Sequence, residues 1–311
     1  MKNSNLLKRT YIVCLLAMLC CFLWGSAFPC VKIGYEMFQI GSDQTMSQIL
    51  FAGVRFTLAG LLVLLFGSLI SHKILVPKRS SCKNIVLICL FQTVLQYLFF
   101  YIGLAHTSGV KASIVEASNV FLAIVVANVI FHQEKFTVSK ILGCVVGFAG
   151  VVLINLTGSG LEGKMTLTGE GFILLSALSY AVSSVLIKRF SADENPVVIS
   201  SYQFMIGGLI MILAGLCGGG RLHPASPYSS LMMLYMALIS AVAYTIWSIL
   251  LKYNPVSKVA VFGFMNPVFG VVLSAILLKE GSQIPFLQCA ASLILVCLGI
   301  YIVNRKNIFT P

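Results

Sequence analysis

The chain alternates long apolar segments with short polar connections. Ten segments are predominantly apolar over about 20 residues each, at residues 11–33, 47–71, 84–105, 110–131, 138–157, 168–188, 197–217, 228–250, 256–278 and 284–303. A bilayer core of about 30 Å needs an α-helix of about this length. The pattern therefore predicts ten transmembrane helices. The longest connections, 34–46, 72–83 and 218–227, are too short to hold a soluble domain.

The composition excludes a soluble fold. Hydrophobic residues make up 59% of the 311 residues and charged residues only 10%, whereas a soluble domain has about 45–50% apolar and about 25% charged residues. So few charged side chains cannot cover the surface of a soluble protein of this size. The first apolar segment is longer than the core of a signal peptide and nine others follow it, so we interpret it as a helix. We expect an all-α polytopic membrane protein.

The net charge of +12 follows from the placement of lysine and arginine between the apolar segments. With the N-terminus inside, fifteen of these residues fall in cytoplasmic connections and five in outer ones, while Arg55 lies within a span. Cytoplasmic connections of membrane proteins carry such an excess. Both termini are therefore expected in the cytoplasm, and the basic charge gives no support to a nucleic-acid partner.

A weak internal repeat divides the chain into residues 1–157 and 158–311, each with five predicted helices. Aligning the two parts superimposes several polar residues in the same order: Lys32 on Lys188, Arg55 on Gln203, Tyr97 on Tyr244, Lys111 on Lys258, Asn119 on Asn266 and Glu134 on Glu280. A unit with an odd number of spans enters the membrane inverted the second time. Inverted repeats are typical of carriers that work by alternating access, although a duplication kept for folding alone gives the same pattern.

Local motifs carry a family resemblance. The sequence LWGSAF at 23–28, the glutamates Glu134 and Glu280 at span ends, and the glycine-rich fifth and tenth segments resemble the drug/metabolite transporter superfamily, specifically its ten-helix EamA-type members. The resemblance implies an inverted-repeat carrier of small metabolites such as amino acids in a bacterial cytoplasmic membrane. The proline often found in the fourth helix of this family is replaced by Val120, which leaves the bending of that helix open.

Two charged residues, Arg55 and Glu116, lie inside predicted spans. Counting at 1.5 Å per residue from the outer ends of their helices places both about 9 to 11 Å deep. We therefore predict that they pair or share a water-filled vestibule. Three roles stay open, namely a static tie between helices, contact with a substrate, and proton coupling through Glu116.

Polar and aromatic side chains inside the other spans form a second candidate site. Each alone is explained by hydrogen bonds between helices, because lipid offers such groups no partner. Together they predict a substrate cavity between the two halves, suited to an apolar side chain or to a cation. Its expected residues are Trp24, Ser26, Gln96, Tyr97, Tyr101, Asn119, Tyr180, Tyr244, Trp247 and Asn266.

Pro29 and Pro267 lie within spans and are candidate hinges, since proline removes a helical hydrogen bond. Sequence motifs for an ATP-binding loop or for hydrolase and metalloprotease chemistry are absent. The ten cysteines follow no metal-binding spacing. We expect no enzyme, no catalytic residue, no cofactor and no metal site.

The function predicted from these patterns is secondary transport of a small metabolite, with an amino acid or related zwitterion first and export as the favoured direction. The expected partners are the lipid bilayer, the substrate and, as an option, protons. Efflux of lipophilic cations or drugs is the second interpretation, and a membrane receptor or scaffold without transport is the third. The substrate, the coupling ion and the oligomeric state are not encoded in any motif.

Overall fold

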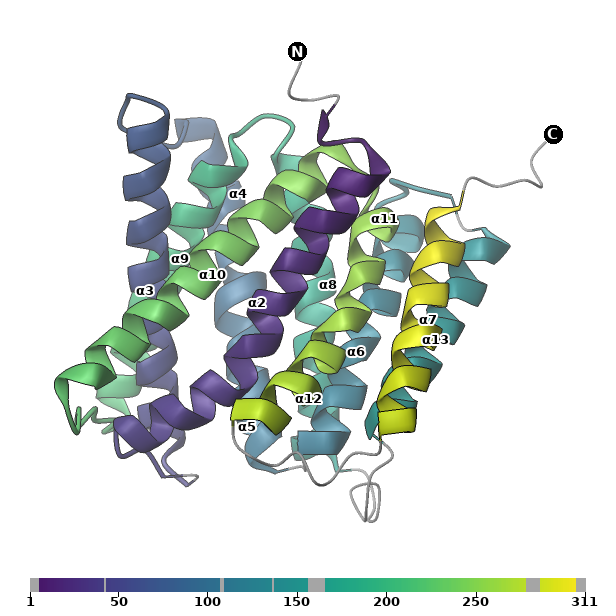
Figure 1. Cartoon of the computed structure of the whole chain (residues 1–311). Coiled ribbons are helices and arrows are strands. Elements are labelled where there is room, and N and C mark those ends of the chain that lie inside the picture. Colours follow the sequence, from purple (N-terminus) through teal and green to yellow (C-terminus); the bar gives the residue numbers. More distant parts are fainter. Residues whose placement is uncertain are drawn as a thin grey trace.

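A computed structural model describes residues 6–41, 43–106, 109–135, 137–155, 166–277 and 286–305. Within these ranges the chain is helical and has no strand. Figure 1 shows the helices packed side by side as one bundle. The helices of the first half are α2 (Thr10–Met37), α3 (Thr45–Ile70), α4 (Cys82–Cys89) continuing through η2 (Leu90–Leu95) into α5 (Gln96–Ala105), α6 (Gly109–Val125) continuing into η3 (Val126–Ile130), and α7 (Val138–Asn155).

The second half has the same order of helices. It consists of η5 (Leu167–Gly171) continuing into α8 (Phe172–Phe190), α9 (Pro196–Cys217), α10 (Pro227–Tyr253), α11 (Val256–Ala260) continuing through η6 (Val261–Phe264) into α12 (Met265–Leu277), and α13 (Phe286–Asn304). Two of these helices begin with strong local signals. Asn195 accepts a hydrogen bond from the Val197 amide ahead of α9, and Ser226 and Ser229 form a capping box at the start of α10.

Six described helices are long and apolar enough to cross a membrane: Thr10–Met37, Thr45–Ile70, Arg79–Leu104, Leu167–Phe190, Pro196–Cys217 and Pro227–Tyr253. Four shorter apolar helices, Val115–Ile130, Val138–Leu153, Val256–Gly270 and Ala290–Asn304, lie where the sequence predicts the other spans. The bundle exposes many large apolar side chains, such as Leu65, Leu69 and Leu213. Such a surface is typical of a protein in contact with lipid.

Two antiparallel helix pairs join the halves through glycine. A Cβ atom at Gly60 of α3 would lie 2.6 Å from the Ser201 carbonyl oxygen of α9, and one at Gly208 of α9 would lie 2.7 Å from the Gly53 carbonyl oxygen of α3. Because no side chain intervenes, the two backbones approach closely. Glycine joins α7 to α13 in the same way, where a Cβ at Gly299 would lie 2.6 Å from the Gly143 carbonyl oxygen.

The two ends of the bundle differ in charge. In Figure 1, α2 begins and α13 ends at the same, upper end. Lysines from several connections hold this end together. The Lys78 amide donates to Glu194 at 2.9 Å, Lys188 donates to the Asn254 carbonyl oxygen, and Lys258 donates to the Lys8 carbonyl oxygen at 3.0 Å. We call it the basic end, and we call the other, where Ala225 donates to Met37 at 2.9 Å, the opposite end.

Candidate functional site

Aromatic side chains from both halves meet in the middle of the bundle. The Trp24 ring of α2 lies 4.9 Å from the ring of Tyr244 and 5.0 Å from that of Trp247, both on α10. The Tyr244 hydroxyl forms a hydrogen bond of 2.6 Å with the hydroxyl of Tyr97 on α5. Tyr97 and Tyr244 are superimposed by the sequence repeat. The structure thus brings equivalent residues of the two halves into direct contact.

Further rings extend this group, which we call the central cluster. Phe56 of α3 lies 4.4 Å from Tyr97 and 5.3 Å from Phe204 of α9. The Tyr101 ring lies 6.1 Å from Tyr97, and Tyr180 of α8 belongs to the same apolar core. Five predicted cavity residues of aromatic type therefore come together with Tyr180: Trp24, Tyr97, Tyr101, Tyr244 and Trp247. Their side chains pack against one another and are largely buried.

Several buried polar atoms in this region have no hydrogen-bond partner. In most proteins buried polar atoms are satisfied, so each such atom asks for a physical explanation. Some of these unpaired atoms belong to residues that were singled out from the sequence. Both hydrogen-bond donors and hydrogen-bond acceptors are among them. They are Nε1 of Trp24, Nε1 of Trp247, Oε1 of Gln96, Oδ1 of Asn266 and Oε2 of Glu116. Ser118 of α6 and Thr245 of α10, not singled out from the sequence, contribute unpaired hydroxyls on two of the same helices.

Other predicted cavity residues have local contacts. The Ser26 hydroxyl donates to the Leu23 carbonyl oxygen of its own helix at 2.7 Å, so this contact does not link helices. Asn119 of α6 faces Gly263 of η6, in the segment next to Asn266. Asn119 and Asn266, superimposed by the repeat, are thus on neighbouring segments.

Arg55 and Glu116 do not form an ion pair. The Arg55 Nε donates to the Met236 carbonyl oxygen at 3.2 Å and to the Ser240 hydroxyl at 3.1 Å, both on α10. Glu116 faces Asn119 and Ser176 instead. Equal depth in the membrane does not mean that two side chains point toward each other. Helix α3, which carries Arg55, packs against α9 and α10, whereas α6, which carries Glu116, packs against α8. The described structure shows no direct contact between these two residues, and the shared vestibule and the three roles stay predictions.

The two candidate hinges differ in their surroundings. Helix α2 continues through Pro29 without interruption. Pro267 lies in the first turn of α12, where a missing amide hydrogen costs little, and the chain ahead of it tightens into the 3₁₀ turn η6. α6 stays α-helical past Val120 and changes to a π-helix only at Val126. The ninth predicted span is therefore irregular near its proline, and the hinge roles stay predictions.

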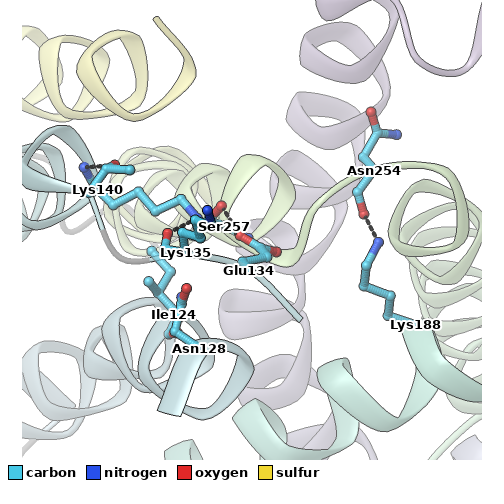
Figure 2. Close-up of polar contacts among 9 residues, drawn as sticks. Ile124, Asn128, Glu134, Lys135, Lys140, Lys188, Asn254 and Ser257 are labelled. Carbon is cyan, nitrogen blue, oxygen red and sulfur yellow. Dashed lines mark hydrogen bonds and ion pairs between the residues drawn. The ribbon is translucent and has the colours of Figure 1, made fainter. Parts of the chain in front are cut away.

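A second site, which the sequence marked only through Glu134, lies at the basic end (Figure 2). Glu134 follows η3 in the first half, and its carboxylate accepts a hydrogen bond of 2.7 Å from Lys140. Across the boundary between the halves, the Ser257 amide donates to Oε1 of Glu134 at 3.2 Å, and the Ser257 hydroxyl donates to Oε2. Ser257 lies in the first turn of α11, so the carboxylate also faces a helix N-terminus, which favours negative charge. We call these contacts the Glu134 network.

A second contact closes the same end nearby. The Lys188 ammonium of α8 donates to the carbonyl oxygens of Leu251, at 3.3 Å, and Asn254 at the C-terminus of α10 (Figure 2). A cation at a helix C-terminus is favourable. A hollow of about 320 Å³ opens beside the Glu134 network and is lined by Glu134, Lys140, Pro255, Ser257, Lys258, Val303 and Asn304. The described basic end is thus closed by polar contacts between helices.

The Glu134 carboxylate is ionised at neutral pH. Burial raises its pKa, but the hydrogen bonds from Lys140 and Ser257 and the charge of Lys140 lower it by more, so the pKa lies below its ordinary value. Folding therefore gains stability from this group above the ordinary carboxyl range. That stability is lost as the pH falls through the lowered pKa.

Comparisons with known proteins agree on a family. The model of the EamA-like transporter family matches residues 11–156 and again residues 167–305. The Bacillus subtilis strain 168 protein named uncharacterized transporter YvbV is 26% identical over 310 residues, which cover 97% of this chain and 94% of the relative. The Escherichia coli K12 protein named uncharacterized inner membrane transporter YedA is 26% identical over 306 residues, covering 93% and 92%.

A solved structure shares the fold. It is titled "Crystal structure of protein", is 17% identical in sequence, and superimposes with a TM-score of 0.71 over 94% of this chain and 96% of the other. At that identity the likeness concerns the arrangement of helices alone.

Proposed function

Because the chain belongs to the EamA-like transporter family of the drug/metabolite transporter superfamily, we propose that it moves a small zwitterionic metabolite through the central cluster by alternating access. The chain is a multi-pass membrane protein, as its apolar helices and its relatives indicate. The amino-acid class, export as the direction, and a bacterial cytoplasmic membrane as the location are parts of this proposal.

The observation that carries the proposal is the set of unpaired polar atoms around the central cluster. The indole N–H groups of Trp24 and Trp247 are donors suited to oxygen atoms of a substrate. Oxygen atoms of Gln96, Asn266 and Glu116 are acceptors suited to an ammonium group. A zwitterion supplies the missing partner to both kinds, and the aromatic rings suit an apolar side chain. Unpaired buried atoms are costly, and a ligand relieves that cost.

The contacts between the halves support an inverted repeat. Glycine-mediated packing relates the halves in a reciprocal manner: Gly60 of α3 faces Ser201 of α9, and Gly208 of α9 faces Gly53 of α3. The repeat offset superimposes Gly60 on Gly208 and Gly53 on Ser201. The family model also matches once in each half. Five spans in each half, inverted relative to one another, account for this reciprocity.

The closed basic end supports alternating access around the central cluster. The Glu134 network joins the two halves, and the Lys188 contact joins α8 to α10 within the second half. Both are polar, so they can break without exposing apolar surface. The lysine-rich connections support placing this end in the cytoplasm, together with both termini. In this proposal, opening toward the cytoplasm requires Glu134 to release Ser257.

Thermal stability against a ligand panel tests the proposal. We expect at least one amino acid or related zwitterion to raise the melting temperature of the purified protein, because a ligand at about 100 times its Kd stabilises the folded state by about 2.7 kcal/mol. The Glu116→Gln variant should lose most of this gain, because the amide cannot provide a negative charge for the ammonium group.

The panel also includes lipophilic cations, and Lys73→Gln, a change at an exposed residue of the basic end, serves as the control. The control should respond like the wild type. Stabilisation by lipophilic cations but by no zwitterion would contradict the metabolite proposal and favour drug efflux, which the aromatic rings also suit.

A further inference from the structure

Arg55 is a buried cation held from one side only. It lies about 15 Å along α3 from the first residue of that helix, and only 4% of its surface is exposed. Its Nε donates to the Met236 carbonyl oxygen at 3.2 Å and to Ser240 Oγ at 3.1 Å, both on α10. These contacts orient the planar guanidinium and engage its inner edge. Nη1 and Nη2, with four N–H groups, have no hydrogen-bond partner among the described residues.

The charge of Arg55 is not balanced by an acid. Within the described ranges no carboxylate lies within ion-pair distance of it, and Glu134 and Glu194 form their hydrogen bonds at the basic end. Glu116, the acid we expected to pair with it, faces Asn119 and Ser176. An unbalanced charge inside a membrane protein is costly, and such residues mark pathways for substrates or ions.

The surroundings of Arg55 consist of aromatic rings and phenol groups. Its Cζ lies 5.4 Å from the Phe56 ring, which in turn packs on Tyr97. The phenol oxygens of Tyr35, Tyr97 and Tyr101 are within its electrostatic range. The Tyr35 hydroxyl is buried beside the Tyr101 hydroxyl. A planar fork of N–H donors and a pair of phenol hydroxyls therefore adjoin an aromatic wall, and the described residues supply no carboxylate there.

We propose that Arg55 and the Tyr35 hydroxyl bind the carboxylate of the transported substrate. A carboxylate matches the guanidinium fork in shape and accepts two parallel hydrogen bonds from it. Phe56 and Tyr97 then contact the apolar part of the same molecule. This inference rests on the proposed function and narrows its substrate class to compounds that carry a free carboxylate group. It makes Arg55 a specificity residue, and it does not depend on an ammonium group in the substrate.

Matched probes test the carboxylate directly. The melting temperature of the purified wild-type protein is measured with phenylalanine, phenylalaninamide, 3-phenylpropanoate and phenethylamine, and with the same series derived from leucine. Compounds with a carboxylate should raise the melting temperature in at least one series, and their amides and amines should not. Equal shifts for an acid and its amide would overturn the inference, and so would the absence of a shift with every carboxylate probe.

Variants then assign the effect to Arg55. Loss of charge-assisted hydrogen bonds predicts a roughly 10- to 100-fold weaker affinity in Arg55→Gln. Arg55→Lys, which keeps the charge but not the fork, should lie in between. Arg79→Gln, at an exposed arginine of the basic end, should match the wild type. Unchanged carboxylate affinity in a folded Arg55→Gln variant would overturn the inference.

The design separates this inference from the proposed function. If the reconstituted protein transports an amino acid and its amide equally well, the proposed function holds and the role of Arg55 as the carboxylate site fails. The Nε of Arg55 also holds α10. If the loss of this contact prevents Arg55→Gln from folding, the comparison of acid and amide in the wild-type protein still tests the inference.

Discussion

Replacing Gly208 with leucine is expected to abolish the folded bundle. A Cβ atom at this position would lie 2.4 Å from Thr57 Oγ1, 2.5 Å from the Thr57 amide nitrogen and 2.7 Å from the Gly53 carbonyl oxygen. Two of these atoms belong to the backbone of α3, so only a movement of the whole helix relieves the clash. Overpacking in a core costs about 1–3 kcal/mol, and a leucine against backbone should exceed that range. The measurement is the melting temperature and the monodisperse yield in detergent.

Leu209→Ala is the matched control for this substitution. Leu209 is the next residue of α9 and is half exposed on the outer surface of the bundle. Its loss should change the melting temperature little, because no close helix contact is removed. Gly60→Leu, at the position that the repeat superimposes on Gly208, should be as harmful as Gly208→Leu. Normal stability of either leucine variant at a glycine position would show that α3 and α9 do not pack as described.

Replacing Glu134 with alanine is expected to open the basic end. The substitution leaves the Lys140 ammonium and the Ser257 amide without their acceptor. Removing one partner of a fully buried ion pair costs about 3–5 kcal/mol, and the cost is smaller here because Lys140 is 15% exposed. Because Ser257 lies in the first turn of α11 and its amide bonds to Glu134, this amide should lose protection against hydrogen exchange while the middle of α9 stays protected. Transport should fall as well, since a carrier that stays open at one end cannot alternate.

Glu194→Ala is the matched control, since Glu194 accepts hydrogen bonds from the Lys78 and Asn195 amides at the same end. It should leave exchange of the Ser257 amide unchanged. The pH gives a second check. The lowered pKa of Glu134 means that its contribution is present at neutral pH and disappears as acid protonates it. The difference in melting temperature between wild type and Glu134→Gln should therefore shrink below the ordinary carboxyl range, and a constant difference would contradict this role.

The positions of the helices could be predicted because lipid imposes a length and an apolar composition on each span. The predicted segment 47–71 corresponds to α3 at Thr45–Ile70, and 138–157 corresponds to α7 at Val138–Asn155. Departures from the regular α-helix were not predictable. The π-helix η2 places Thr93 and Gln92 against Gln203, with hydrogen bonds of 2.6 and 2.9 Å. Such a bulge depends on packing between helices, which leaves no local pattern in the sequence.

The candidate site was predicted in part. The aromatic residues of the central cluster were recognised as candidate site residues because polar or bulky side chains stand out within apolar spans. In the structure their rings pack together. The contacts of Arg55 with Met236 and Ser240 of α10 were not predicted, because depth along a helix does not tell which neighbour a side chain faces. The contact between Glu134 and Ser257 joins residues 123 positions apart. The repeat superimposes Glu134 on Glu280 but gives no indication that it contacts Ser257. Glu280 lies outside the described residues.

Exchange in proteoliposomes tests the central claim most directly. The purified protein is reconstituted into liposomes preloaded in turn with each of the common amino acids, and uptake of the same radiolabelled compound is followed. The account predicts accelerated exchange of at least one of them, strongly reduced by Glu116→Gln and by Glu134→Ala but unaffected by Lys73→Gln. Exchange at the rate of protein-free liposomes for every amino acid, with correctly folded protein, would contradict it.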